Sequence, residues 1–108
     1  HLILDELGIT DISALENLEK LNYLQLSNNL ISDISPLQNL KHITTLLLDN
    51  NKLEELPSWI LDWGLDIKWQ ITHTSDHICI GGNPFKNLPE EVIRKGNSAI
   101  KAHLRKQS

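Results

Sequence analysis

Apolar residues recur along the first half of the chain in two blocks with the same spacing. Each block places leucine or isoleucine at four positions and asparagine at a fifth, and the second block lies 22 residues after the first. The matched residues are Leu21, Leu24, Leu26, Asn29 and Ile31, and then Ile43, Leu46, Leu48, Asn51 and Leu53. A fixed period of this length predicts a repeat architecture in which each unit buries its apolar side against its neighbours.

Within one block, apolar residues two positions apart indicate a β-strand, because alternate side chains of a strand point to the same face. We therefore expect Leu24 and Leu26 to point into the core and Gln25 to point out of it. Asn29 and Asn51 follow the strands at the turn. A buried amide at that position can satisfy backbone groups that water does not reach, so we interpret both asparagines as structural.

The first unit repeats the pattern imperfectly. It carries Leu7 where the later units carry asparagine, and the chain begins within the predicted strand without a polar cap. Terminal repeats of a solenoid need a polar outer face. Either further repeats precede residue 1, or a partner covers this edge, and we favour the first of these expectations.

The last unit is interrupted by extra residues. Apolar and polar residues alternate from Leu65 to Ile71, and the repeat pattern resumes at Ile78, where Asn83 follows Asn51 at a spacing of 32 instead of 22. The two predicted strands are joined by a short polar segment, which is too short for a parallel crossover. The pattern predicts an antiparallel β-hairpin inserted near residues 65–77.

The C-terminal segment does not follow the repeat. Pro89 and the two acidic residues after it are typical of a helix start. The apolar residues that follow lie on one helical stripe, and Gly96 weakens the helix before Asn97. We expect residues 1–88 to form the repeats and residues 89–108 to form a helix that caps them.

The repeat blocks resemble the leucine-rich repeat superfamily across residues 2–88. That resemblance implies an α/β repeat solenoid, a fragment of a right-handed β/α superhelix with about four repeats. We expect a parallel sheet on its concave side, the hairpin insertion in the last repeat and the capping helix. Such a scaffold favours a protein-protein interaction module over an enzyme.

The end of the chain is similar to the end of the repeat domain in bacterial Roco proteins. The segments that carry this likeness are residues 64–69, residues 78–85 and residues 88–100. In that family the repeats precede a Ras-like GTPase domain and a dimerisation domain. The resemblance implies, as the alternative function, a regulatory segment whose C-terminal helix couples to a following GTPase domain. The chain itself contains no GxxxxGK[ST] motif, so we expect no nucleotide binding in it.

Charge is distributed unevenly along the chain. Residues 1–66 carry 11 acidic residues and 3 lysines, whereas residues 67–108 carry 3 acidic and 7 basic residues. A nucleic-acid-binding domain usually has a basic surface across the fold, so we expect no nucleic-acid partner. There is no long apolar run and no signal peptide, so we expect no membrane insertion. The single cysteine favours a reducing, cytoplasmic setting.

Residue types that bind metals or act in catalysis lie near the insertion. His73, His77 and Cys79 are close in sequence, but a complete set of four ligands at tight spacing is missing. We therefore expect neither a metal nor another cofactor. Cys79 is predicted on a strand and not at a helix start that lowers thiol pKa, so we expect no catalysis by this chain.

The outward positions of the strands are the candidate functional site. They form columns across the concave sheet, beginning at His1, Ile3 and Asp5 in the first unit. We expect exposed apolar and aromatic side chains at the centre, which suits binding of a protein partner or an adjacent domain. The predicted binding residues are Tyr23, Gln25, Ser27, Thr45, Leu47, Asp49, His77 and Cys79.

Overall fold

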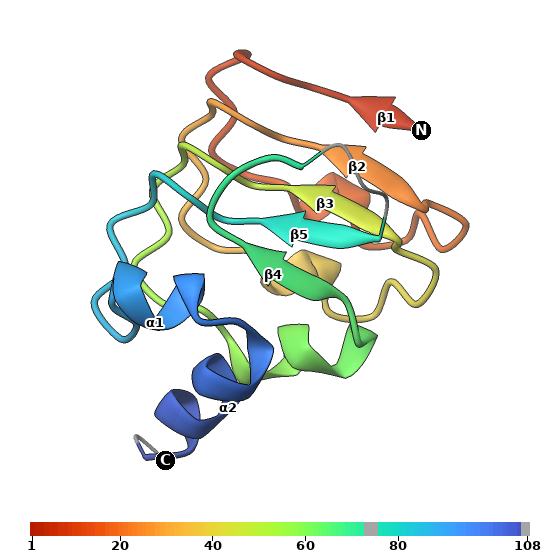
Figure 1. Cartoon of the computed structure of the whole chain (residues 1–108). Helices are drawn as coiled ribbons and strands as arrows, with labels where there is room; N and C mark the ends of the chain where they lie inside the picture. Colours follow the sequence, from red (N-terminus) through yellow and green to blue (C-terminus); the bar gives the residue numbers. More distant parts are fainter. Residues whose placement is uncertain (73–75, 107–108) are drawn as a thin grey trace.

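In the computed structural model, which describes residues 1–72 and 76–106, five short strands form one sheet. The strands are β1 (Leu2–Ile3), β2 (Tyr23–Gln25), β3 (Thr45–Leu47), β4 (Asp66–Lys68) and β5 (His77–Cys79). Their order across the sheet is β1-β2-β3-β5-β4, and each neighbouring pair is parallel (Figure 1). The predicted parallel sheet is therefore confirmed.

The strand register follows the sequence period. Leu24 pairs with Leu2 on one side and with Leu46 on the other, each 22 residues away. Leu46 in turn pairs with Ile78, where the extra residues of the last unit lengthen the spacing. One period of the sequence is thus one step across the sheet, which stacks the inward side chains into continuous layers.

Each of the first strands ends where the backbone enters the left-handed conformation. Glu6, Asn28 and Asn50 have φ values of 56°, 59° and 58°, and they are 22 residues apart. Asparagine adopts this conformation more readily than most other residues. The turn then places the following residue of each later unit, Asn29 or Asn51, beneath the strand ends.

These two asparagines and Asn83 join neighbouring repeats through hydrogen bonds. The Asn51 side-chain nitrogen donates to the carbonyl oxygens of Leu26 (2.9 Å) and Leu48 (3.0 Å), and its oxygen accepts from the Ile31 backbone nitrogen (3.1 Å). Asn29 and Asn83 make the equivalent contacts with the repeats before them. All three side chains are buried, so their structural role is confirmed.

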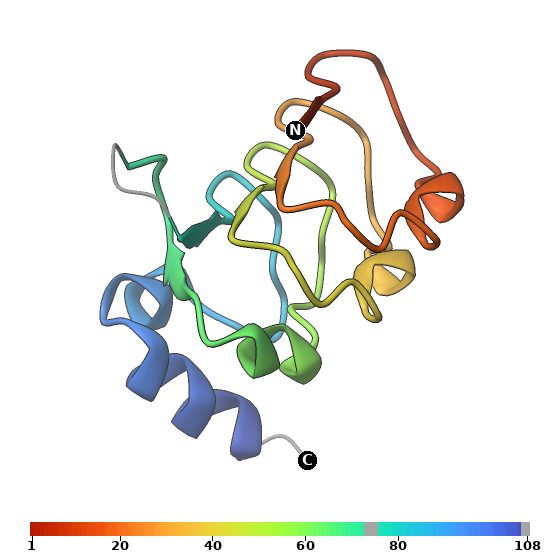
Figure 2. The same ribbon diagram turned by 90° about the vertical axis from the view of Figure 1, so that its right-hand side faces the viewer.

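The return segments on the other side of the sheet are 3₁₀ helices. They are η1 (Ser13–Leu15), η2 (Ser35–Leu37) and η3 (Ser58–Trp63), and Figure 2 shows them together on one side of the solenoid. Asp11 and Asp33 start the first two by accepting hydrogen bonds from backbone nitrogens two residues later, both at 2.9 Å. A 22-residue unit has room for one such turn, so the expected β/α units contain 3₁₀ instead of α-helices.

Aliphatic side chains fill the space between the sheet and the 3₁₀ helices. The side chains with almost no exposure are Leu24, Leu26, Ile31, Leu37, Leu40, Leu46, Leu48, Leu53, Leu56, Ile60, Ile67 and Ile78. The core is therefore built from the repeating positions of the sequence, because each repeat covers the apolar flank of the next.

The predicted antiparallel hairpin is wrong. Strand β4 runs parallel to β5, with Ile67 opposite Ile78 and the Ile80 backbone nitrogen donating to the Lys68 oxygen at 2.9 Å. Because each strand has three residues, the chain needs to travel back only about 10 Å, which residues 69–76 can span. β4 lies at the edge of the sheet, and β5 takes the next repeat position beside β3.

Two helices follow the repeats instead of the single predicted helix. They are α1 (Glu90–Arg94) and α2 (Asn97–Arg105), separated at Gly96, whose φ is 101°. The separation lies at the glycine that weakens the predicted helix. The Asn97 side chain accepts a hydrogen bond from the Ile67 nitrogen (2.9 Å) and donates to the Leu65 oxygen (2.7 Å). The outer edge of β4 is therefore blocked by a side chain of α2.

Substitution of Asn51 by alanine should lower the free energy of unfolding by roughly 2 to 4 kcal/mol, because buried backbone groups of two repeats lose their partners. Urea unfolding measures the change. Asn39 is exposed in the same repeat, so Asn39→Ala is the control and should change stability by less than roughly 0.5 kcal/mol. Equal effects of both variants would show that the amide does not join the repeats.

Candidate functional site

The sheet brings the predicted binding residues together on its concave side. Tyr23 pairs with Thr45, Gln25 pairs with Leu47, and Leu47 pairs with Cys79. Paired residues of parallel strands point to the same face. The strands thus present these side chains as adjacent rows, in the columns that the sequence predicts.

Most of these side chains are nevertheless buried. Leu47 is only 4 % exposed, although we expected an exposed apolar residue at the centre of the face. The expectation of exposure is also wrong for Ser27, Thr45, His77 and Cys79. Of the predicted set, only Tyr23, Gln25 and Asp49 retain partial exposure.

The inserted segment explains this burial at the β5 end of the sheet. The Cys79 sulfur lies 3.6 Å from the backbone oxygen of Trp69. A β-carbon at Gly81 would lie 1.9 Å from the same oxygen, so this close approach of two backbones requires glycine. Figure 2 shows the chain after β4 on the opposite side of the sheet from the 3₁₀ helices. The insertion therefore lies over the β5 side of the concave face.

The β1–β2 side remains accessible and has a fixed polar network. The Tyr23 hydroxyl donates to the Gln25 side-chain oxygen at 3.0 Å, and the Gln25 nitrogen donates to the Asp5 carboxylate. His1 stacks on the Tyr23 ring with centroids 4.6 Å apart. Ile3 lies in the same area with 60 % of its surface exposed. We call His1, Ile3, Tyr23 and Gln25 the open face, and Asp5 lies beside it.

The carboxylates beside the open face receive hydrogen bonds from neutral groups. Asp5 accepts from the Ser27 backbone nitrogen at 3.1 Å, and Asp49 accepts from the Ser27 hydroxyl at 2.5 Å. Neither carboxylate forms an ion pair within the described part of the chain. Their negative charge is therefore available to a basic group of a partner.

Comparison with known families decides what the repeating units are. A family model described as Leucine Rich repeats (2 copies) matches residues 19–61. Residues 19–61 are therefore similar to leucine-rich repeats. The match contains β2, β3 and η2, together with Asn29 and Asn51 of the interrepeat hydrogen bonds. A search of curated proteins finds no match to the chain.

The matched repeats are continued by the same geometry on both sides. β1 and β5 extend the sheet with the same register, and Asn83 repeats the contacts of Asn51. Within the described residues, no helix combines the length and the apolar character that a membrane crossing requires.

The last repeat carries buried groups that could act chemically if they were accessible. Neither ring nitrogen of His77 has a hydrogen-bond partner in the described residues. Burial raises the pKa of the Cys79 thiol to about 11, which disfavours the thiolate that nucleophiles and metal ligands require. His73 lies outside the described residues, and no group of three metal-binding side chains occurs among the described ones.

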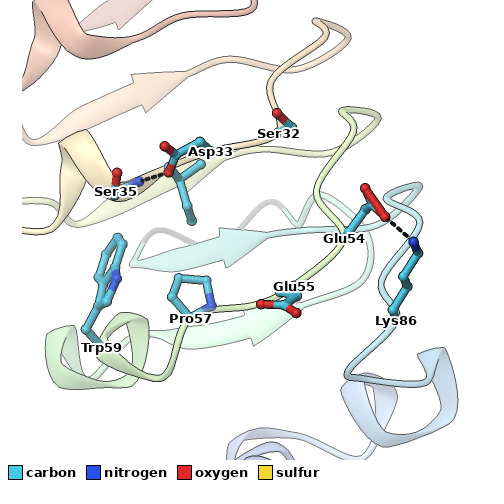
Figure 3. A pocket seen from close by; sticks show the side chains of 9 residues that line it. Ser32, Asp33, Ser35, Glu54, Glu55, Pro57, Trp59 and Lys86 are labelled. Atoms are coloured by element: carbon cyan, nitrogen blue, oxygen red, sulfur yellow. Dashed lines mark hydrogen bonds and ion pairs between the residues drawn. The ribbon is translucent and has the colours of Figure 1, made fainter.

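A pocket of about 470 Å³ lies on the flank of the repeats (Figure 3). Trp59 and Pro57 form its apolar side. Two of its three acidic residues have structural roles, since Asp33 accepts from the Ser35 backbone nitrogen and Glu54 pairs with Lys86 at 2.5 Å. The lining includes hydroxyl groups but no histidine. We therefore regard the open face, and not this pocket, as the candidate site.

Because the pKa of Cys79 is raised, the free energy of unfolding should decrease at alkaline pH. The folded-state pKa of about 11 exceeds the ordinary value of 9.0, so the folded state holds the proton more tightly. The resulting stability is complete below pH 9 and is lost as the pH rises through 11. Between these values the free energy of unfolding should fall by about 1 to 2 kcal/mol more in the wild type than in Cys79→Ala.

Urea unfolding at a series of alkaline pH values tests this expectation. The other titrating groups are common to both proteins, so their contributions cancel in the difference. Parallel curves for the wild type and Cys79→Ala would contradict the burial of a protonated thiol.

Proposed function

We propose that this chain is a protein-interaction module and that its partner binds the open face. The observation that carries the proposal is the hydrogen-bonded row from Tyr23 through Gln25 to Asp5, which lies beside the exposed side chain of Ile3. The family match supports the same reading, because leucine-rich repeats are stacked units that expose an extended sheet for binding.

The open face has the composition that protein interfaces favour. It contains an aromatic ring and an exposed aliphatic side chain, with polar groups next to them. Tyr23 is held on one side by the stacked His1 ring and at its hydroxyl by Gln25. A side chain that is already fixed loses little conformational freedom on binding, which favours affinity.

The charge of the repeats favours a basic partner surface. Residues 1–66 contain 11 acidic residues and 3 lysines, and Asp5 and Asp49 lie beside the open face without a cationic partner in the described residues. Complementary charge increases the association rate and selects among partners. We propose a partner segment that presents an apolar side chain next to a lysine or arginine.

A peptide ligand is needed to test binding at the open face. Such peptides can be selected from a random phage-displayed library against the immobilised chain. Tyr23→Ala should weaken their binding at least about tenfold, because tyrosine is among the residues that contribute most strongly to interfaces. Tyr23→Phe should retain most of the affinity, since it keeps the ring and loses only the hydroxyl. Gln38→Ala, at the exposed end of η2 on the other side of the sheet, is the control.

Thermal unfolding accompanies the binding assay and separates a lost contact from a lost fold. The half-buried position of Tyr23 implies a small change in melting temperature for Tyr23→Ala. Peptides that bind Tyr23→Ala as tightly as the wild type, but lose binding to Gln38→Ala, would place the interaction on the opposite side of the molecule.

We propose, as the second candidate, a regulatory repeat segment of a Roco-type GTPase. The observation that favours it is the exposed basic surface of the C-terminal helix. Lys101, Arg105 and Lys106 are exposed, whereas Ile100 of the same segment is buried against the rest of the molecule. A helix held on one side and basic on the other is suited to contact an acidic neighbouring domain.

The coding sequence downstream of Ser108 tests this second candidate. A GxxxxGK[ST] motif is expected within about a hundred residues, because the phosphate-binding loop opens a GTPase domain. In that longer protein, exchange of GDP for a GTP analogue should change amide hydrogen exchange in α2, and Lys101→Glu should reduce the change. A downstream sequence without the motif would exclude this function and leave the interaction module unaffected.

A further inference from the structure

The third repeat departs from the first two at the acidic residue that precedes its 3₁₀ helix. Asp11 and Asp33 each accept a hydrogen bond from the backbone nitrogen two residues later. Glu55 lies 22 residues after Asp33, but the residue two positions after Glu55 is Pro57, which has no N–H group. Glu55 forms no hydrogen bond or ion pair with the residues that the structure describes. Its carboxylate is therefore not used to hold the fold.

Trp59 departs from the repeat pattern in the same unit. Leu37 lies 22 residues before it and is fully buried in the core. Because η3 begins one residue later in its repeat than η2, Ile60 occupies the fully buried place and Trp59 is only half-buried. The Trp59 side chain therefore lines the pocket on the flank of the repeats instead of filling the core (Figure 3).

The Trp59 ring is held in place by a second tryptophan, Trp63. The two rings meet edge to face, with their centroids 5.6 Å apart and their planes at 75°. The Trp63 indole nitrogen donates to the Leu40 oxygen at 2.7 Å, so this second ring is itself anchored. An aromatic ring that is already fixed loses little conformational freedom when a ligand packs against it, which favours binding.

The pocket brings this ring and the Glu55 carboxylate together. Its volume of about 470 Å³ lies within the usual range of ligand sites. In the view of Figure 3, Glu55 lies between the Trp59 ring and the ion pair of Lys86. The lining carries three carboxylates but one ammonium group, that of Lys86, which is paired with Glu54. The excess of negative charge favours a cationic ligand.

We propose that this pocket binds an arginine side chain of a protein partner, with the guanidinium group against the Trp59 ring and paired with the Glu55 carboxylate. A planar guanidinium presents two parallel N–H donors to a carboxylate and stacks on aromatic rings, whereas a lysine ammonium is a point charge. The chain already contains an arginine placed in this way, since Arg94 lies over the Trp69 ring at 6.0 Å from its centroid.

A protein segment is the expected carrier of this arginine, because stacked repeats present extended surfaces to other proteins. No residue of the pocket belongs to the open face. The pocket is therefore a second site, which a partner can occupy whether or not the open face binds anything.

An NMR titration with the capped peptide acetyl-Gly-Arg-Gly-amide tests the site. The chain has three tryptophans, and single tryptophan-to-phenylalanine variants assign their indole N–H signals. The Trp59 signal should shift to saturation, whereas the signal of Trp69, which lies outside this pocket, should not. The lysine peptide should bind about threefold more weakly, because it lacks the planar cation. The peptide with neutral citrulline should cause no saturable shift.

Glu55→Gln removes the charge and keeps the shape of the side chain. It should weaken binding of the arginine peptide at least about threefold, because a charged pair is lost. Its melting temperature should stay unchanged, since Glu55 is exposed and makes no contact that holds the fold. The matched control is Glu16→Gln, an exposed position of the first repeat that does not line the pocket.

Tyr23→Ala separates this site from the open face, and it should bind the arginine peptide as tightly as the wild type. Loss of binding in Tyr23→Ala but not in Glu55→Gln would place the arginine on the open face and overturn the proposal. Equal affinities for the arginine and lysine peptides, or for Glu55→Gln and Glu16→Gln, would overturn it as well.

Discussion

Hydrogen bonding between the turn asparagine of one repeat and the backbone of the repeat before it is the constraint on which the rest of this structure depends. Asn29, Asn51 and Asn83 each reach across one junction, donating and accepting in buried surroundings. An unpaired polar group in such a place would be costly, so the junction tolerates little displacement. The strands are thereby held in register, and the layers of leucine and isoleucine between them follow.

The register also determines what the chain can present to other molecules. Outward residues at one spacing form columns, so the concave face is encoded by positions that alternate with those of the aliphatic core. Tyr23 and Gln25 belong to such columns and join Asp5 across a repeat junction. The stacking that builds the core therefore also fixes the side chains of this face. Binding there does not require the ordering of a loop, so it loses less conformational entropy.

The insertion in the last repeat changes both the sheet and its accessible surface. β4 occupies the sheet edge, and the chain after it approaches Gly81 and Cys79 closely enough that only glycine fits. The burial that follows raises the pKa of the Cys79 thiol to about 11, which disfavours the reactive thiolate. The same unit is closed on its outer side by Asn97, which satisfies backbone groups at the outer edge of β4.

The sequence by itself determined the repeat length, the strands, the parallel pairing of β1 to β3 and the role of the asparagines, because each rests on a short pattern that every unit must satisfy locally. It also indicated the break at Gly96 and the columns that contain Tyr23 and Gln25. Only the tertiary structure decided that β4 runs parallel to β5 and that Leu47, Thr45 and His77 are buried. β4 can run parallel to β5 because both strands are short, so the connection between them has little distance to cover. The exposure of the outward side chains depended on which distant segment lies over the sheet. Neither quantity is contained in the spacing of residues along the chain.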